Sequence, residues 1–198
     1  MILLLSTSDT DLLSARASGA PFRLANPARV GDDPDALAPL LTGVDLVVVR
    51  ILGGYRMWQP GLDALLAGDL PVVALGGEQL PDADLMARST VPQGIAAQAH
   101  AYLAQGGPDN LRELHAFLSD TVLLTGHGFA PPAEQPSWGV LPRDAATGTG
   151  PTVGILYYRA HQLSGNTAFV ETLCAAVEAA GGVPLPVFCA SLRTPDAA

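Results

Sequence analysis

The 198-residue sequence contains no lysine, and its ten basic side chains are all arginines. Without lysine the chain cannot supply the lysine of a P-loop nucleotide site or a lysine that forms a Schiff base. Its 19 acidic residues bring the formal net charge to −9, and the arginines form no basic run. Because phosphate contacts need clustered cations, we expect no nucleic-acid partner. If the protein catalyses a reaction that consumes ATP, the ATP has to be bound by another motif or another chain.

Cysteine, clustered metal ligands and long apolar runs are also scarce. The two cysteines, Cys174 and Cys189, form no Cys-x-x-Cys pair and predict buried thiols rather than a disulfide framework. The four histidines share no ligand spacing, so we expect no metal site within the chain. The apolar start at 1–5 is too short for a secretion signal or a membrane span. These features predict a cytoplasmic chain with no membrane partner.

Short apolar runs alternate with helix-forming stretches along residues 1–126. The runs predict buried strands at 2–7, 22–25, 45–51 and 71–75. Ser8 and Asp11 form a capping pattern at the start of a short helix, and two longer helical patterns follow at 94–104 and from Pro108. Continuous apolar strands separated by helices indicate a parallel α/β sheet, Rossmann- or flavodoxin-like, with both faces covered. Residues 1–126 are therefore predicted to form an N-terminal α/β domain that ends in two helices.

The composition changes to proline, glycine, alanine and threonine at 127–150, which predicts a linker. After it, a strand at 152–158, a helix at 166–180 and a strand at 184–190 predict one βαβ unit within 151–198. One such unit cannot cover both faces of a parallel sheet. Either these strands join the first sheet, or a second α/β domain continues in further sequence. The long linker favours the second alternative, and the chain is then the N-terminal piece of a longer protein.

Ligands of open α/β sheets bind beyond the carboxyl ends of the strands. Arg50 closes the third predicted strand, and Gly76, Gly77 and Glu78 close the fourth. Glycine lets a ligand approach the backbone closely, but a glycine pair can equally form an ordinary turn. These residues are candidates for substrate binding.

The segment 157–166 is the second candidate, because it places two phenols, a guanidinium and an imidazole between a strand and a helix. Arg159 could bind a carboxylate, and His161 could transfer protons or bind a metal. Asn166 precedes a helix N-terminus, which favours anions. The alternative is structural: Asn166 caps the helix, Gly165 turns the chain and His161 lies on the surface.

Six segments carry a resemblance to a known family, and they are 4–13, 22–29, 75–78, 119–126, 156–161 and 165–169. Together they resemble the large subunit of aerobic cobaltochelatase (CobN type). More distantly, the sequence is similar to the porphyrin-binding H subunit of magnesium chelatase. The likeness extends over nearly the whole chain. Members of this family are much longer, so the resemblance implies that the chain is an N-terminal portion.

The resemblance implies an ATP-dependent metal–nitrogen ligase that inserts Co²⁺ into hydrogenobyrinic acid a,c-diamide during aerobic cobalamin biosynthesis. It implies that the large subunit holds this corrinoid and that two smaller partner subunits form the ATPase machinery. Cobalt is then a substrate, ATP lies on the partners, and this segment binds no cofactor of its own. Since the corrinoid bears carboxylates, Arg50, Arg159 and Arg29 become candidates to bind them. The segment alone would be inactive.

Other classes of protein remain open at this point. The chain could be a non-enzymatic α/β interaction or scaffold module, with all its strands in one sheet. Apolar surface left uncovered on the last βαβ unit would count against that alternative. It could also belong to a porphyrin-binding subunit like that of magnesium chelatase, or bind another carboxylated ligand.

Overall fold

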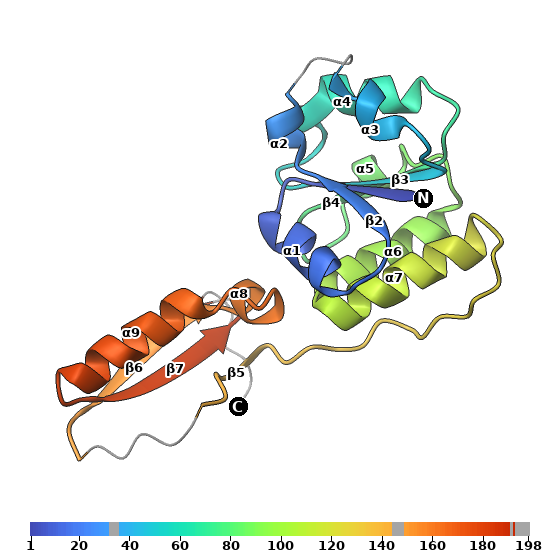
Figure 1. Ribbon diagram of the computed structural model, residues 1–198. Helices are drawn as coiled ribbons and strands as arrows, with labels where there is room; N and C mark the ends of the chain where they lie inside the picture. Colours follow the sequence, from blue (N-terminus) through green and yellow to red (C-terminus); the bar gives the residue numbers. More distant parts are fainter. Residues whose placement is uncertain (32–35, 144–148, 191, 193–198) are drawn as a thin grey trace. The chain divides into compact units, whose positions relative to one another are not determined.

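The computed structural model describes residues 1–31, 36–143, 149–190 and 192 (Figure 1). The chain divides into two compact units, unit 1 at Met1–Glu134 and unit 2 at Gln135–Ala198. The division lies inside the predicted linker 127–150, part of which, residues 144–148, lies outside the described residues.

Unit 1 contains a four-stranded parallel sheet with the order β2-β1-β3-β4. The strands are β1 (Ile2–Ser6), β2 (Phe22–Ala25), β3 (Leu46–Ile51) and β4 (Val72–Gly76). Every residue of β1, β3 and β4 is buried, which requires protein on both faces of the sheet. The predicted α/β class and its parallel sheet are confirmed.

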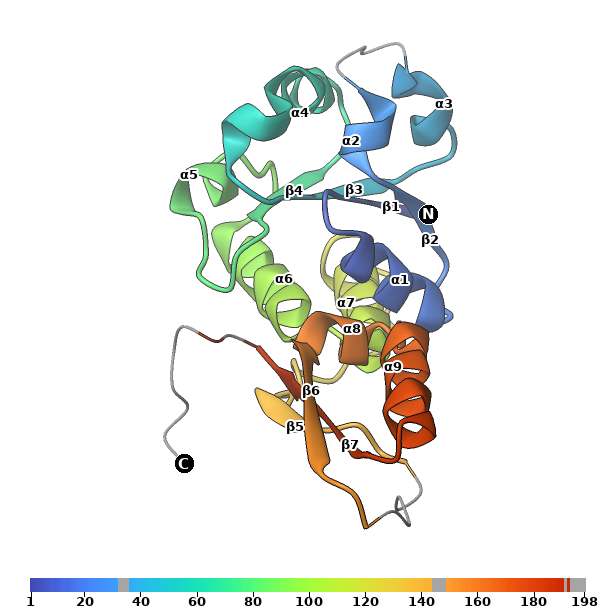
Figure 2. The same ribbon diagram turned by 90° about the vertical axis from the view of Figure 1, so that its left-hand side faces the viewer.

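Helices cover the sheet on both sides (Figure 2). One side carries α1 (Asp9–Ala17), α6 (Gln93–Gln105) and α7 (Pro108–Thr121). The other side carries α2 (Pro27–Val30), α3 (Ala38–Leu41) and α4 (Gln59–Leu66), with the 3₁₀ turn η2 (Tyr55–Trp58) before α4. The short helix α5 (Ala83–Met86) follows β4.

The alternation of side chains along each strand divides the core of unit 1 into two layers. Leu4 and Val48 belong to the layer beneath α1, α6 and α7, whereas Leu5 and Val49 belong to the layer beneath α4. Burying one such side chain contributes about 1.5–3 kcal/mol. Because β3 and β4 pair directly in parallel, their carboxyl ends lie next to one another, and the candidate site lies at these ends.

Unit 2 has its own three-stranded sheet with the order β5-β7-β6, so the alternative in which its strands join the first sheet is wrong. Its elements are β5 (Trp138–Val140), β6 (Thr152–Tyr158), α8 (Arg159–Leu163), α9 (Ala168–Ala179) and β7 (Val183–Cys189). The parallel pair β6–β7 and the helix α9 between them form the predicted βαβ unit, and α8 is an additional short helix. β5 pairs antiparallel with β7 and lies in the predicted linker.

One face of the unit 2 sheet packs against α9, through Tyr157, Phe188, Val170 and Cys174. Of the two free thiols, Cys174 is buried as predicted, whereas Cys189 is half-buried, so the prediction is wrong for Cys189. The strand residues of opposite parity expose large apolar side chains, which are Trp138, Val140, Leu156, Tyr158 and Leu185. This exposed apolar face is the feature that counts against a self-contained scaffold module.

In the described parts of the chain, none of the helices combines the length and the apolar character needed to cross a membrane.

Candidate functional site

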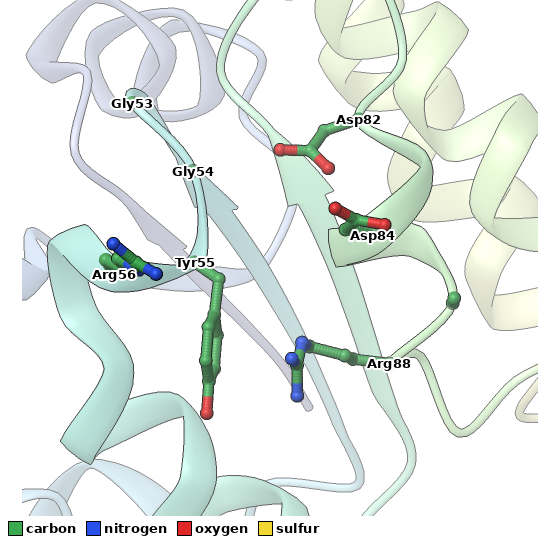
Figure 3. Close-up of a pocket in the computed structure, with 8 residues that line it drawn as sticks. Gly53, Gly54, Tyr55, Arg56, Asp82, Asp84 and Arg88 are labelled. Atoms are coloured by element: carbon green, nitrogen blue, oxygen red, sulfur yellow. The ribbon is translucent and has the colours of Figure 1, made fainter.

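A cleft of about 510 Å³ opens at the carboxyl ends of β3 and β4 (Figure 3). We call it the β3–β4 cleft, and its lining residues are Gly53, Gly54, Tyr55, Arg56, Asp82, Asp84, Ala87 and Arg88. Its position matches the general location of ligand sites in open α/β sheets.

The loop after β3 is shaped by a glycine pair. Gly53 and Gly54 have φ angles of 86° and 85°, which side chains other than glycine rarely adopt. The Gly53 amide donates to Glu78 Oε1 at 3.0 Å, so the predicted residue Glu78 ties the exit of β4 to the exit of β3. The wall of the cleft formed by this loop is therefore held in place by backbone geometry and one charged side chain.

Aromatic and basic side chains form part of the cleft. The guanidinium carbon of Arg88 lies 3.7 Å from the centre of the Tyr55 ring, a cation–π contact. The Tyr55 hydroxyl donates to Asp63 Oδ1 at 2.6 Å, and this hydrogen bond raises the pKa of the phenol. Tyr55 therefore stays neutral at physiological pH, and Figure 3 shows Arg56 and Arg88 on either side of it.

Carboxylates line the part of the cleft formed by α5. Asp82 caps this helix, since its Oδ1 accepts from the Leu85 amide at 3.0 Å. A Cβ atom added at Gly54 would lie 3.6 Å from Asp82 Oδ2, which places this carboxylate next to the glycine pair. Figure 3 shows Asp84 close to Asp82 and farther from Tyr55 than Arg88 is. The cleft thus has basic and acidic groups in different parts of its wall.

Arg50, a predicted substrate ligand, is buried beneath this edge of the sheet at 5% exposure. Its guanidinium pairs with Asp11 Oδ1 at 2.9 Å, and the same nitrogen donates to the Leu103 carbonyl at 3.0 Å. Its other nitrogens donate to the carbonyls of Gly76 and Gly77. In the structure Arg50, which lies in β3, is therefore bonded to α1, to α6 and to the end of β4. Its contact with substrate stays a prediction.

Asp11 has a different role from the one its capping pattern predicts. Ser8 occupies the N-cap position of α1 but makes no side-chain capping hydrogen bond. Asp11 instead accepts from Ser6 Oγ at 2.6 Å and pairs with Arg50. In place of the expected capping interaction, Ser8 Oγ pairs with the Thr10 hydroxyl at 2.6 Å, and Ser6 and Arg50 contact the Asp11 carboxylate.

Gly76 and Gly77 are required for close packing. A Cβ atom at Gly77 would lie 2.7 Å from the Leu52 Cα atom, and one at Gly76 would lie 2.8 Å from the Asp82 Cβ atom. The chain leaving β4 therefore passes against the chain leaving β3 at Gly77, and against Asp82 at Gly76, more closely than any other residue type would allow. Whether a substrate also approaches these glycines stays a prediction.

The second predicted cluster lies in unit 2, at the carboxyl end of β6. Arg159 is buried, it donates to the Gln135 carbonyl at 3.3 Å, and burial lowers the pKa of its guanidinium. The His161 ring packs edge-on against Phe169 with 5.0 Å between the ring centres. His161 Nδ1 is buried and has no hydrogen-bond partner within the described residues. Their role in substrate binding stays a prediction.

The structural alternative for this segment is right about Gly165 and wrong about Asn166. Gly165 has a φ angle of 70° and turns the chain, as that alternative expects. Asn166 is not the cap, because the N-cap position of α9 is Thr167. The exposed Asn166 donates its backbone amide to the His161 carbonyl at 2.9 Å, so its side chain stays a candidate for ligand contact.

Two further expectations from the sequence concern Arg29 and a metal site. Arg29, after β2, is exposed and pairs with Asp9 Oδ2 at 3.0 Å. Within the described ranges, the histidine, cysteine, aspartate and glutamate side chains form no group of three or more that could hold a metal ion.

A family model described as CobN/Magnesium Chelatase matches residues 100–198, half of the chain. The chain belongs to this family. Two similar curated proteins are both named aerobic cobaltochelatase subunit CobN. The one from Pseudomonas aeruginosa is 28% identical over 98% of this chain and 17% of its own length. The one from a Sinorhizobium species is 32% identical over 97% of this chain and 18% of its own length.

A solved structure, the catalytic subunit of cobaltochelatase from Mycobacterium tuberculosis, matches with a TM-score of 0.77 and 61% identity. This match covers 99% of the present chain and 16% of the solved one. The chain thus spans about a sixth of the length of the CobN-family relatives that it matches.

Sequence reasoning about this CobN-family chain missed most of the cleft. It identified strand ends, but it did not identify Tyr55, Arg56 or Arg88 as candidates. The helix α5, which carries Asp84 and precedes Arg88, has only four residues and no amphipathic repeat. The available signal was Asp82, a capping residue followed three residues later by the buried Leu85.

His100, on α6, predicts a pH effect on the stability of this CobN-family chain. Burial lowers the pKa of His100, and its Nε2 lies 3.1 Å from the Glu78 carbonyl oxygen. A histidine in an unfolded chain has a pKa of about 6.5. At a pH between the lowered pKa of folded His100 and this value, the unfolded state binds more protons than the folded state. The free energy of unfolding should therefore fall as the pH drops from about 7.5 to about 5.5.

Urea unfolding at the two pH values measures this effect, and His100→Gln should reduce the difference between them. His115 contributes in the same direction, because burial also lowers its pKa, so some pH dependence should persist in this variant. An unchanged pH dependence in His100→Gln would contradict the prediction.

Proposed function

We propose that this chain is a substrate-binding part of a cobaltochelatase, which inserts Co²⁺ into the corrinoid hydrogenobyrinic acid a,c-diamide during aerobic cobalamin biosynthesis. This proposal rests on the similarity to one solved structure. The catalytic cobaltochelatase subunit from Mycobacterium tuberculosis is 61% identical over 99% of this chain. Cobalt is the substrate of this reaction, and the corrinoid receives it.

The contribution of this chain is to bind the carboxylated substrate. Arginine is suited to this role because its planar guanidinium can form two parallel hydrogen bonds with a carboxylate. Arg56 and Arg88 line the β3–β4 cleft of unit 1. In unit 2, Arg159, His161 and Asn166 remain candidates for a second contact.

ATP binding belongs to other subunits in this proposal. The sequence has no lysine and therefore no P-loop lysine. Two partner subunits are proposed to bind and hydrolyse ATP. The chain alone, at about a sixth of its relatives' length, is proposed not to insert the metal.

The test is an absorbance titration of the chain with metal-free hydrogenobyrinic acid a,c-diamide, followed also by tryptophan fluorescence. We expect saturable binding that Arg159→Ala or His161→Ala weakens. Protoporphyrin IX, titrated in parallel, should bind more weakly. No binding of the corrinoid by the folded chain would overturn the proposal, and preferred porphyrin binding would favour a subunit like that of magnesium chelatase.

The alternative of a pure interaction module is less well supported. A self-contained module of this kind is expected to have all its strands in one sheet, whereas the described strands form two separate sheets.

A further inference from the structure

The β3–β4 cleft contains charges of both signs that do not neutralise one another. Arg56 and Arg88 share it with Asp82 and Asp84. Among the residues that the structure describes, neither arginine forms an ion pair within 4.0 Å with either carboxylate. Four charged groups therefore face one space of about 510 Å³, a volume typical of small-ligand pockets.

Part of the cleft is also preorganised. Tyr55 holds Arg88 by the cation–π contact and is itself held by Asp63. Asp82 is held as the cap of α5, and Gly53 by its hydrogen bond to Glu78. Because these groups are already ordered, a ligand would lose little free energy in arranging them.

The charges select the chemistry of the ligand. The two guanidiniums favour a carboxylate, whereas the two carboxylates accept hydrogen bonds from N–H groups and repel a second negative charge. A phosphate, with its higher charge, would be opposed by Asp82 and Asp84. The matching ligand carries a carboxylate and a neighbouring uncharged N–H donor, such as a primary amide.

The surroundings of the cleft add an apolar requirement. Leu52 and Met57 border the Gly53–Arg56 segment, Leu80 precedes α5, and all three side chains are exposed. A ligand that inserts only its polar groups into the cleft could lay an apolar body over these side chains.

We propose that the β3–β4 cleft is a subsite for polar side arms of an amphipathic ligand. In it, Arg56 and Arg88 bind a carboxylate arm, and Asp82 and Asp84 accept from a neighbouring amide arm. The subsite deepens and rests on the proposed function, because an acid that is also a diamide carries both kinds of arm.

The test uses small probes that imitate one pair of arms. Succinamate has a carboxylate and a primary amide, succinate has two carboxylates, and succinamide has two amides. Each probe, and inorganic phosphate, is titrated into the ¹⁵N-labelled chain while the amide signals of Gly53, Gly54 and Tyr55 are followed by NMR. We expect saturable shifts, with succinamate binding most tightly.

Variants assign the two halves of the subsite. Arg56→Gln or Arg88→Gln should each weaken succinamate binding by about tenfold, since each removes one charge-assisted contact. Asp84→Asn should remove the preference for succinamate over succinate. Arg112→Gln is the matched control, because Arg112 is an exposed arginine of α7 paired with Asp109, and it should change nothing.

The corrinoid titration separates this inference from the proposed function. Arg88→Gln should also weaken the corrinoid. Corrinoid binding unaffected by Arg56→Gln and Arg88→Gln, together with no probe shifts at the cleft, would overturn the subsite and leave the proposed function standing. Probe binding at the cleft without corrinoid binding would support the subsite and overturn the proposed function. Phosphate binding more tightly than succinamate would overturn the subsite.

Discussion

Replacing Arg50 with leucine should lower the free energy of unfolding of unit 1 by about 3–5 kcal/mol, because it leaves a buried carboxylate without its cation. Asp11, 9% exposed, would keep only its hydrogen bond from Ser6. The carbonyls of Gly76, Gly77 and Leu103 would lose their donor as well. The substitution thus disconnects α1, the exit of β4 and α6 at one point.

Urea unfolding followed by tryptophan fluorescence measures this loss. Trp58, in unit 1, is 3% exposed, whereas Trp138 is already 60% exposed in the folded chain, so Trp58 should dominate the change. The control is Arg112→Leu, which breaks an exposed pair with Asp109 and should cost no more than about 1 kcal/mol. The double variant Arg50→Leu/Asp11→Leu should lose less than the sum of the single variants. A loss below about 1 kcal/mol for Arg50→Leu would contradict the structural role.

Gly77→Ala should destabilise unit 1 by about 1–3 kcal/mol, the usual cost of overpacking. The added Cβ atom would lie 2.7 Å from Leu52 Cα and 2.8 Å from Leu52 N, which are backbone atoms of the chain leaving β3. Since backbone cannot rotate away as a side chain can, the loop that carries Gly53 and Gly54 would have to move. The substitution should therefore also change the NMR signals of the β3–β4 cleft.

Gly94→Ala is the matched control for this substitution. Gly94 lies near the start of α6, and a Cβ atom there would have nothing within 4 Å. Alanine also has a higher helix propensity than glycine, so this variant should lose no stability. Equal unfolding free energies for the two variants would show that the approach of Gly77 to Leu52 is not tight.

Much of the fold could be predicted because its signal is local. The strands of unit 1 are short apolar runs bounded by polar residues or glycine, and β1, β3 and β4 lie within a residue or two of their predicted positions. The missed elements lack such signals. β5 has three residues between prolines and is held by its ladder with β7, and α5 has a single turn.

The candidate site was harder to predict because it depends on contacts between distant segments. Arg50 and Arg88 are both arginines near the ends of elements, and no local pattern separates them. Asp11 provides a buried partner for Arg50, 39 residues away in the sequence. Arg88 instead lies over the Tyr55 ring at the surface of a cleft.

The sequence by itself determined the α/β class, the parallel sheet of its core, the absence of a P-loop lysine and the resemblance to cobaltochelatase. These properties depend on residue type and spacing along the chain. Only the tertiary structure decided which arginine is buried, why Gly76 and Gly77 must be glycine and where a cleft opens. Those outcomes depend on which segments meet in space, and burial and charge pairing are properties of the meeting point rather than of either segment.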